Sequence, residues 1–77
     1  MLRMEFIKSI LVDVVYGYEP MTRSLAEAIR TLRCERQLPF EEIPRALNAG
    51  FGTDFALGKE LCKKAGEFLN DKDVHWD

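Results

Sequence analysis

The sequence predicts an all-α fold, a small single-domain bundle of three to four helices. Apolar residues recur at helical spacing in several stretches, and prolines and glycines separate these stretches. The 77 residues, of which 47% are hydrophobic, are enough for one modest core. We expect residues 1–70 to form this domain and residues 71–77 (DKDVHWD) to form a flexible acidic tail.

Residues 4–16 form the first predicted helix. Its apolar residues recur at spacings of three and four, although the β-branched run ILVDVV also permits a strand. The expected core face consists of Ile7, Ile10, Leu11, Val14 and Val15. Val12 and Tyr16 fall on the other side, where they are ordinary exposed residues, are covered by another helix, or begin a docking patch.

The second predicted helix begins at Pro20 or at Ser24 and ends before Leu38-Pro39, because a residue that precedes proline avoids helical dihedrals. Its expected core face consists of Met21, Leu25, Ala28, Ile29 and Leu32. The opposite face gathers Arg23, Arg30 and Arg33. These arginines form either a solvated charged face or a site for carboxylates or phosphates.

Two further helices are predicted in the C-terminal half. A short one covers residues 44–48, with residues 40–43 as an additional turn, and a longer one runs from Asp54 to about Asn70 with Thr53 as its N-cap. The inward residues of the longer helix are expected to be Leu57, Leu61, Cys62, Ala65, Phe68 and Leu69. Gly58 lies within this apolar face, where it would let another helix approach closely.

This C-terminal half is helix-turn-helix-like, since a short helix, a glycine-containing turn and a capped helix follow one another. In a DNA complex, the contacts would come from Thr53, Lys59 and Lys63. However, Asp54 and the apolar Phe55 and Ala56 stand at the start of the second helix, before its first lysine, Lys59. The tail holds three of the 13 acidic residues and one of the 11 basic ones, so residues 1–70 hold ten of each. Such a balance is atypical of a nucleic-acid-binding domain.

No motif in the sequence carries a reaction. Cys34 and Cys62 form no CxxC pair, and the one histidine, His75, lies in the predicted tail. We therefore expect two reduced thiols, with one disulfide as the alternative. We also expect no catalytic residue, no metal and no cofactor, so that the protein is not an enzyme. Lys8 and Asp13 interrupt the N-terminal apolar run, which argues against a signal peptide or membrane span and for a cytoplasmic protein.

The function that we expect is that of a small regulatory or adaptor protein, which binds and modulates a larger protein with an acidic surface, in the transcription machinery or elsewhere. The predicted contact residues are Val12, Tyr16, Arg23, Arg30, Arg33 and Trp76. Trp76 either frays with the tail, folds back onto the core or inserts into a partner. The main alternative is a helix-turn-helix DNA-binding regulator. A homodimer formed through the first helix is a third interpretation.

Overall fold

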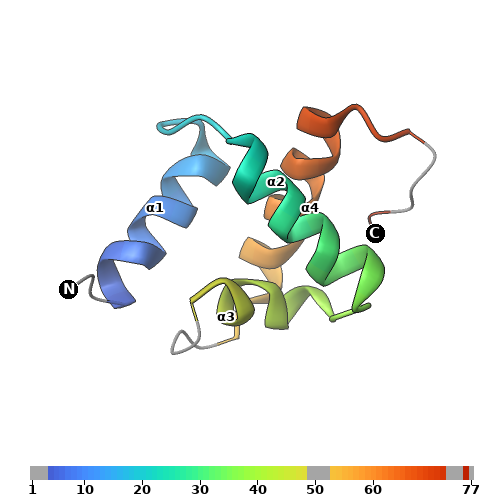
Figure 1. The fold of residues 1–77 in the computed structure, drawn as a ribbon. Coiled ribbons are helices and arrows are strands. Elements are labelled where there is room, and N and C mark those ends of the chain that lie inside the picture. Colours follow the sequence, from blue (N-terminus) through green and yellow to red (C-terminus); the bar gives the residue numbers. More distant parts are fainter. Residues whose placement is uncertain (1–3, 49–52, 73–75, 77) are drawn as a thin grey trace.

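The longest helix, α4 (Phe55–Leu69), lies at the centre of the computed structural model, and the other helices pack around it (Figure 1). The structure describes residues 4–48, 53–72 and 76, apart from the side chains of residues 4–8 and 48. Within these ranges the chain forms four α-helices and no strand, which confirms the predicted all-α bundle.

Helix α1 (Met4–Tyr16) has the predicted bounds, so its β-branched run is helical. Leu11 and Val14 are buried in the core, whereas Ile10 is 39% exposed and belongs to the surface. Gly17 then turns the chain with a φ of +85°, a left-handed conformation that glycine adopts without strain. Of the predicted core face, the side chain of Ile7 lies outside the described residues.

Helix α2 (Arg23–Arg30) begins between the two predicted starts. Thr22 is its N-cap, and the Thr22 hydroxyl accepts a hydrogen bond from the backbone N–H of Leu25 at 3.2 Å. The helix continues as a π-helical segment, η1 (Thr31–Glu35), in which the N–H of Arg36 donates to the Thr31 carbonyl at 2.9 Å. Gln37, with a φ of +57°, ends this segment just before Leu38-Pro39, where the sequence predicted the end of the helix.

The face of α2 that meets the core differs from the prediction. Ala26 and Ile29 are fully buried, while Ala28, which was expected to face inward, is exposed. Alanine carries little hydrophobic signal, so the two alanines could not be ranked from the sequence. Ala26 faces inward because α2 packs extensively against α4, and the small side chain permits a close approach. On the same helix and its continuation, Arg30 is exposed and pairs with Asp71, and Arg33 is half-buried and donates to the Trp76 carbonyl.

The short helix of the C-terminal half is confirmed, since a 3-10 turn, η2 (Phe40–Glu42), leads into α3 (Ile43–Asn48). The start of α4 needs a correction: Asp54, rather than Thr53, is the N-cap, and its Oδ1 accepts a hydrogen bond from the Leu57 N–H at 3.0 Å. Thr53 lies one residue before the N-cap position, so Asp54 and not Thr53 accepts the hydrogen bond from Leu57. At the other end, Phe68 is 44% exposed instead of inward.

The core is entirely apolar in the part of the chain that the structure describes. It consists of Leu11, Val14, Ala26, Ile29, Ile43, Leu57, Leu61, Cys62, Ala65 and Trp76. Gly58 confirms its predicted packing role, because a Cβ there would lie only 1.8 Å from the carbonyl oxygen of Phe40. No described helix is both long enough and apolar enough to cross a membrane.

Candidate functional site

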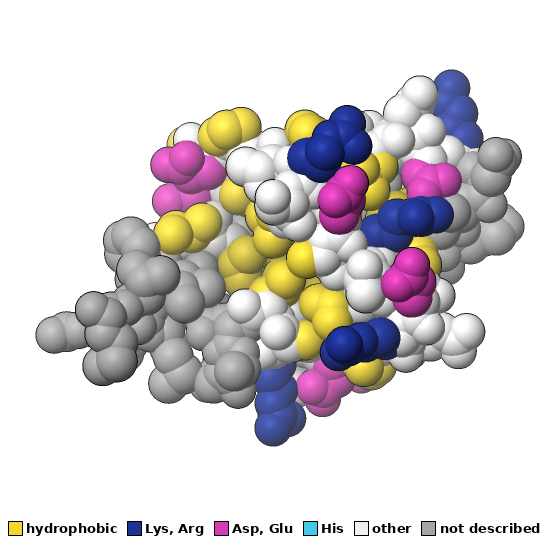
Figure 2. All heavy atoms as spheres, viewed as in Figure 1, with side chains coloured by type: hydrophobic (Ala, Val, Ile, Leu, Met, Phe, Trp, Pro, Cys, Tyr) yellow, Lys and Arg dark blue, Asp and Glu magenta, His cyan; other side chains and the backbone are white. Residues whose placement is uncertain are grey.

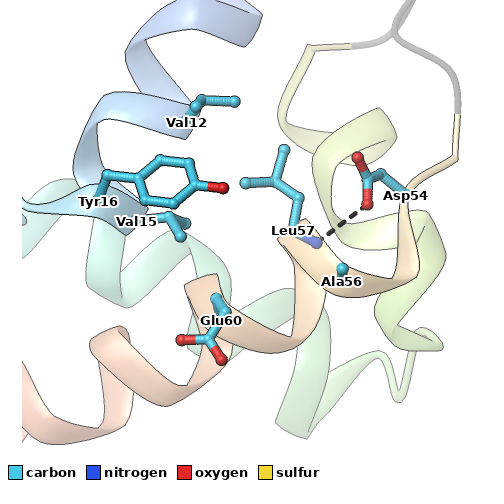
Figure 3. A pocket seen from close by; sticks show the side chains of 7 residues that line it. All are labelled: Val12, Val15, Tyr16, Asp54, Ala56, Leu57 and Glu60. Atoms are coloured by element: carbon cyan, nitrogen blue, oxygen red, sulfur yellow. Dashed lines mark hydrogen bonds between the residues drawn. The ribbon is translucent and has the colours of Figure 1, made fainter.

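A groove of about 400 Å³ separates α1 from the first turns of α4 (Figure 3). The residues that line it are Val12, Val15, Tyr16, Asp54, Ala56, Leu57 and Glu60. Three of them come from one side of α1 and the others from the start of α4, so the groove exists only where these two helices meet. Its lining is mainly apolar and comes from two helices, so it is a candidate ligand-binding feature.

The sequence spacing explains both walls of this groove. Val12, Val15 and Tyr16 follow one another by three and one residues and thus share one face of α1. Figure 3 shows the Tyr16 ring extending across the groove toward Leu57 of α4. Val12 is half-buried and Tyr16 is 72% exposed, so the two residues that were predicted to point away from the core lie in one surface feature.

The wall contributed by α4 was missed by sequence reasoning. Ala56 and Glu60 are four residues apart on one helical face, which is a usable signal, but that spacing does not say which helix they oppose. Their pairing with α1 follows from the packing of α1 onto α4, which is a tertiary contact. Leu57 is nearly buried and forms the floor of the groove.

The charged groups of the groove are both acidic. Asp54 is partly buried, and its Oδ1 is occupied by the Leu57 N–H, while Glu60 is exposed. The remaining side chains that line the groove are apolar apart from the Tyr16 hydroxyl. The groove is therefore an apolar channel with a negative rim.

The three arginines of the second helix do not form the free stripe that was predicted. Arg23 lies in an exposed pair with Glu27, at 3.6 Å. Arg30 donates from Nε to the Asp71 carboxylate at 2.9 Å. Arg33 is half-buried, and its contacts are internal to the chain. Only Arg23 is left in a mainly solvent-exposed setting, because α2 is rotated so that Arg30 and Arg33 face the C-terminal segment.

Trp76 lies in the core rather than on the surface. Its side chain is 9% exposed and rests against Gly66 of α4. Of the alternatives weighed for this residue, the structure has the one in which it folds back, so the indole is not available to insert into a partner in this conformation. Asp71 and Lys72 of the predicted flexible tail are also described, whereas residues 73–75 and 77 lie outside the described residues.

The residues predicted to contact DNA, Thr53, Lys59 and Lys63, are all exposed. Lys59 adjoins Glu60, and Asp54 caps the helix that carries both lysines. On the face of the molecule drawn in Figure 2, basic and acidic side chains alternate beside a central apolar area. Helix α4 itself carries Glu60 and Glu67 among its lysines, so it presents mixed charge rather than a positive stripe.

The two cysteines are free thiols in different environments. Cys62 is buried and Cys34 is half-buried. Burial raises the pKa of the Cys62 thiol to about 11, against the opposing influence of the nearby Arg33 guanidinium. Burial also raises the pKa of Cys34. Neither thiol is an activated nucleophile, since the thiolate is the reactive form. Among the described residues no group of three potential metal ligands occurs.

Comparisons of the chain with protein-family models, with curated proteins and with solved structures found no match. What can be argued about its function comes from its own surfaces. The groove between α1 and α4 combines an apolar lining, a defined volume and a single sign of charge.

Proposed function

We propose that this chain is a small non-enzymatic regulatory or adaptor protein, which binds a larger protein by accepting one of its amphipathic helices in the groove between α1 and α4. The observation that supports this proposal is the groove itself, in which exposed Tyr16 and half-buried Val12 and Val15 face Leu57. An apolar helix face laid into such a groove would remove these side chains from water.

The charge of the groove specifies the partner further. With Asp54 and Glu60 on the rim, a helix whose apolar face is flanked by lysine or arginine is electrostatically complementary. This differs from the acidic partner surface expected from the arginines, two of which are engaged within the chain. The expected link to transcription rests on the helix-turn-helix resemblance alone and stays a prediction.

The groove supports a protein partner better than α4 supports DNA. A recognition helix presents its first turns to base edges and phosphates, and here those turns carry Asp54, Phe55 and Ala56. An acidic N-cap repels the phosphate backbone. The same acid favours a basic peptide, so a single feature of the helix argues in opposite directions for the two partners.

The test uses two labelled amphipathic peptides that share an apolar face of leucines and differ in having lysine or glutamate flanks. We expect the lysine peptide to bind the wild-type chain in fluorescence anisotropy and the glutamate peptide to bind at least tenfold more weakly. Val12→Glu should weaken binding of the lysine peptide at least tenfold, because it places a carboxylate in the apolar lining. Glu60→Lys should shift the preference toward the glutamate peptide.

Glu67→Lys is the matched control, since Glu67 is exposed on α4 and does not line the groove. It should leave both affinities within twofold. Equal binding by the two peptides, or equal loss from Glu60→Lys and Glu67→Lys, would refute the groove as the docking site. Salt-sensitive binding to duplex DNA that Lys59→Ala and Lys63→Ala abolish would favour the helix-turn-helix alternative instead. Light scattering at two concentrations tests the homodimer.

A further inference from the structure

The C-terminal segment occupies a second surface, which α2, η1 and α4 form together. Asp71 pairs with Arg30, the backbone carbonyl of Trp76 accepts a hydrogen bond from Arg33, and the Trp76 side chain lies on Gly66. Figure 1 shows the C-terminal end beside α2 and α4, on the side of the molecule away from α1. We call the surface made by Arg30, Arg33 and Gly66 the tail site.

Arg33 is held in place by groups other than the tail. Its Nη1 donates to the Leu38 carbonyl at 2.7 Å, and its guanidinium carbon lies 4.0 Å from the centre of the Phe40 ring. These two contacts fix the guanidinium and leave its Nε–H to donate to the Trp76 carbonyl at 3.2 Å. A donor fixed before its acceptor arrives lowers the entropic cost of binding.

Gly66 gives the tail site its shape. A Cβ at this position would lie 2.8 Å from Nε1 and 2.9 Å from Cδ1 of the Trp76 ring. No real Cβ contact is that short, so any other residue would displace the ring. The absence of a side chain on α4 creates a shallow recess for a flat aromatic group, and Arg30 and Arg33 stand beside it as donors for acidic and carbonyl groups.

The fit of the tail to this site is incomplete. The indole Nε1 of Trp76 is buried without a hydrogen-bond partner among the described residues, which is unfavourable for a polar group removed from water. A phenylalanine ring in the same recess would carry no such donor. The tail is therefore a bound segment that a better-matched segment could replace.

We propose that the tail site is a binding site for a peptide segment that combines an acidic residue with an aromatic residue, and that the chain's own C-terminus occupies it until such a segment displaces the tail. The site is separate from the groove between α1 and α4, so the proposal does not depend on the proposed function. The carboxylate would pair with Arg30, the backbone carbonyl would accept from Arg33, and the ring would lie on Gly66. The partner is a protein segment that resembles residues 71–77 in chemistry.

The test exploits the fact that Trp76 is the single tryptophan of the chain. In the full-length Trp76→Ala variant the recess is empty, and a peptide with the sequence of residues 71–77 then carries the only indole in the sample. We expect its emission to shift to shorter wavelength and saturate on titration with the variant, as the indole leaves water. A scrambled peptide of the same composition should show no saturable shift.

Substitutions in the Trp76→Ala chain separate the contributions. Arg33→Gln should weaken the peptide at least tenfold because it removes a fixed charged donor, and Arg30→Gln, at a more exposed pair, about threefold. Arg23→Gln is the matched control on the same helix and should change the affinity less than twofold. Equal effects of all three substitutions, or a shift with the scrambled peptide, would overturn the proposal.

Two measurements guard against a folding artefact. Circular dichroism checks that each variant stays helical. If Trp76→Ala does not fold, Trp76→Phe replaces it, and the added peptide then competes with the phenylalanine ring of the chain's own tail. A further variant, Gly66→Ala in the otherwise wild-type chain, should shift Trp76 emission to longer wavelength with the helices intact. Emission that stays in the buried range would show that Gly66 does not receive the ring. A wild-type dimer that Trp76→Ala abolishes would assign the site to a second copy and overturn a foreign partner.

Discussion

Helix α4 packs closely against α2 and η2 on one side and faces α1 across a groove on another. Toward α2 and η2 it presents Gly58, Leu61 and Ala65, all buried without room for an extra atom at the glycine. Toward α1 it presents Leu57 and the exposed Ala56, across a groove of about 400 Å³. One side of a single helix is closed and the other is open.

The difference follows from the residue types at each contact. Glycine and alanine let two backbones approach, as Gly58 does with the carbonyl of Phe40. The valines and the tyrosine of α1 are branched or bulky, and α1 packs less extensively against α4 than α2 does, which leaves the groove between α1 and α4. Small residues thus permit close packing on the α2 side, and larger residues leave an open groove on the α1 side.

Gly58→Ala should have the largest effect, because it tests whether the closed side tolerates one added carbon. The new Cβ would lie 1.8 Å from the Phe40 carbonyl oxygen, a backbone atom that cannot turn aside. Overpacking of this kind should destabilise the fold by about 3 kcal/mol, and the gain in helix propensity of about 1 kcal/mol offsets only part of it. Urea unfolding followed by circular dichroism measures the change. An unchanged midpoint would contradict the close approach.

Leu61→Ala removes volume from the same closed side. Leu61 is fully buried, so the substitution should lower the free energy of unfolding by about 3 kcal/mol through lost burial and a residual cavity. Thermal unfolding monitored by circular dichroism provides the measurement. If the loss were under about 1 kcal/mol, Leu61 could not be part of a tightly packed contact.

The pH dependence of stability tests the closed side at Cys62, whose pKa in the folded chain is raised to about 11. In the unfolded chain a cysteine thiol has a pKa of about 8.5. Between these two pKa values the folded state binds more protons than the unfolded state. The contribution of the protonated Cys62 thiol to the free energy of unfolding is therefore complete below about pH 8.5 and is lost as the pH rises toward 11. The slope should reach at most about 1.4 kcal/mol per pH unit.

Comparison of the wild-type chain with Cys62→Ala in urea unfolding at pH 7 and pH 10 isolates this contribution from those of other residues that titrate at high pH. The difference between the two chains should shrink by about 2 kcal/mol over that interval. A constant difference would mean that the Cys62 thiol ionises as readily in the folded chain as in the unfolded one.

Val12→Ala should have the smallest effect on stability, since Val12 is half-buried beside an existing groove and its loss creates no closed cavity. We expect less than about 1 kcal/mol. The same substitution should still weaken binding of the lysine-flanked peptide, because it removes part of the apolar lining. A loss as large as that of Leu61→Ala would erase the contrast between the two sides of α4.

Helix positions could be predicted from the sequence because they depend on local signals. Pro39, Pro44 and Gly17 mark ends and turns, and the spacing of apolar residues located all four helices. The orientation of α2 could not be predicted, since Ala26 and Ala28 give the same weak signal and only the packing of α4 distinguishes them.

The candidate sites were predictable to a different degree. Val12 and Tyr16 stood out as apolar residues on the polar side of α1, and the structure places both in the groove. The opposite wall required knowledge of which helix packs on α1. Arg33 and Trp76 contact one another although they are 43 residues apart in the chain. No local sequence pattern connects them, so the positions of these two residues could not be predicted.

In the π-helical segment at Thr31–Glu35 each hydrogen-bonded turn contains one more residue than a turn of α-helix. This additional residue changes the direction in which the following residues leave the helix. Removing a single residue there would restore regular winding and rotate the following chain by about 100°. Phe40 would then approach α4 at the wrong angle for the glycine that receives its carbonyl. Length variation in this short stretch should be far less tolerated than in the turn after α1.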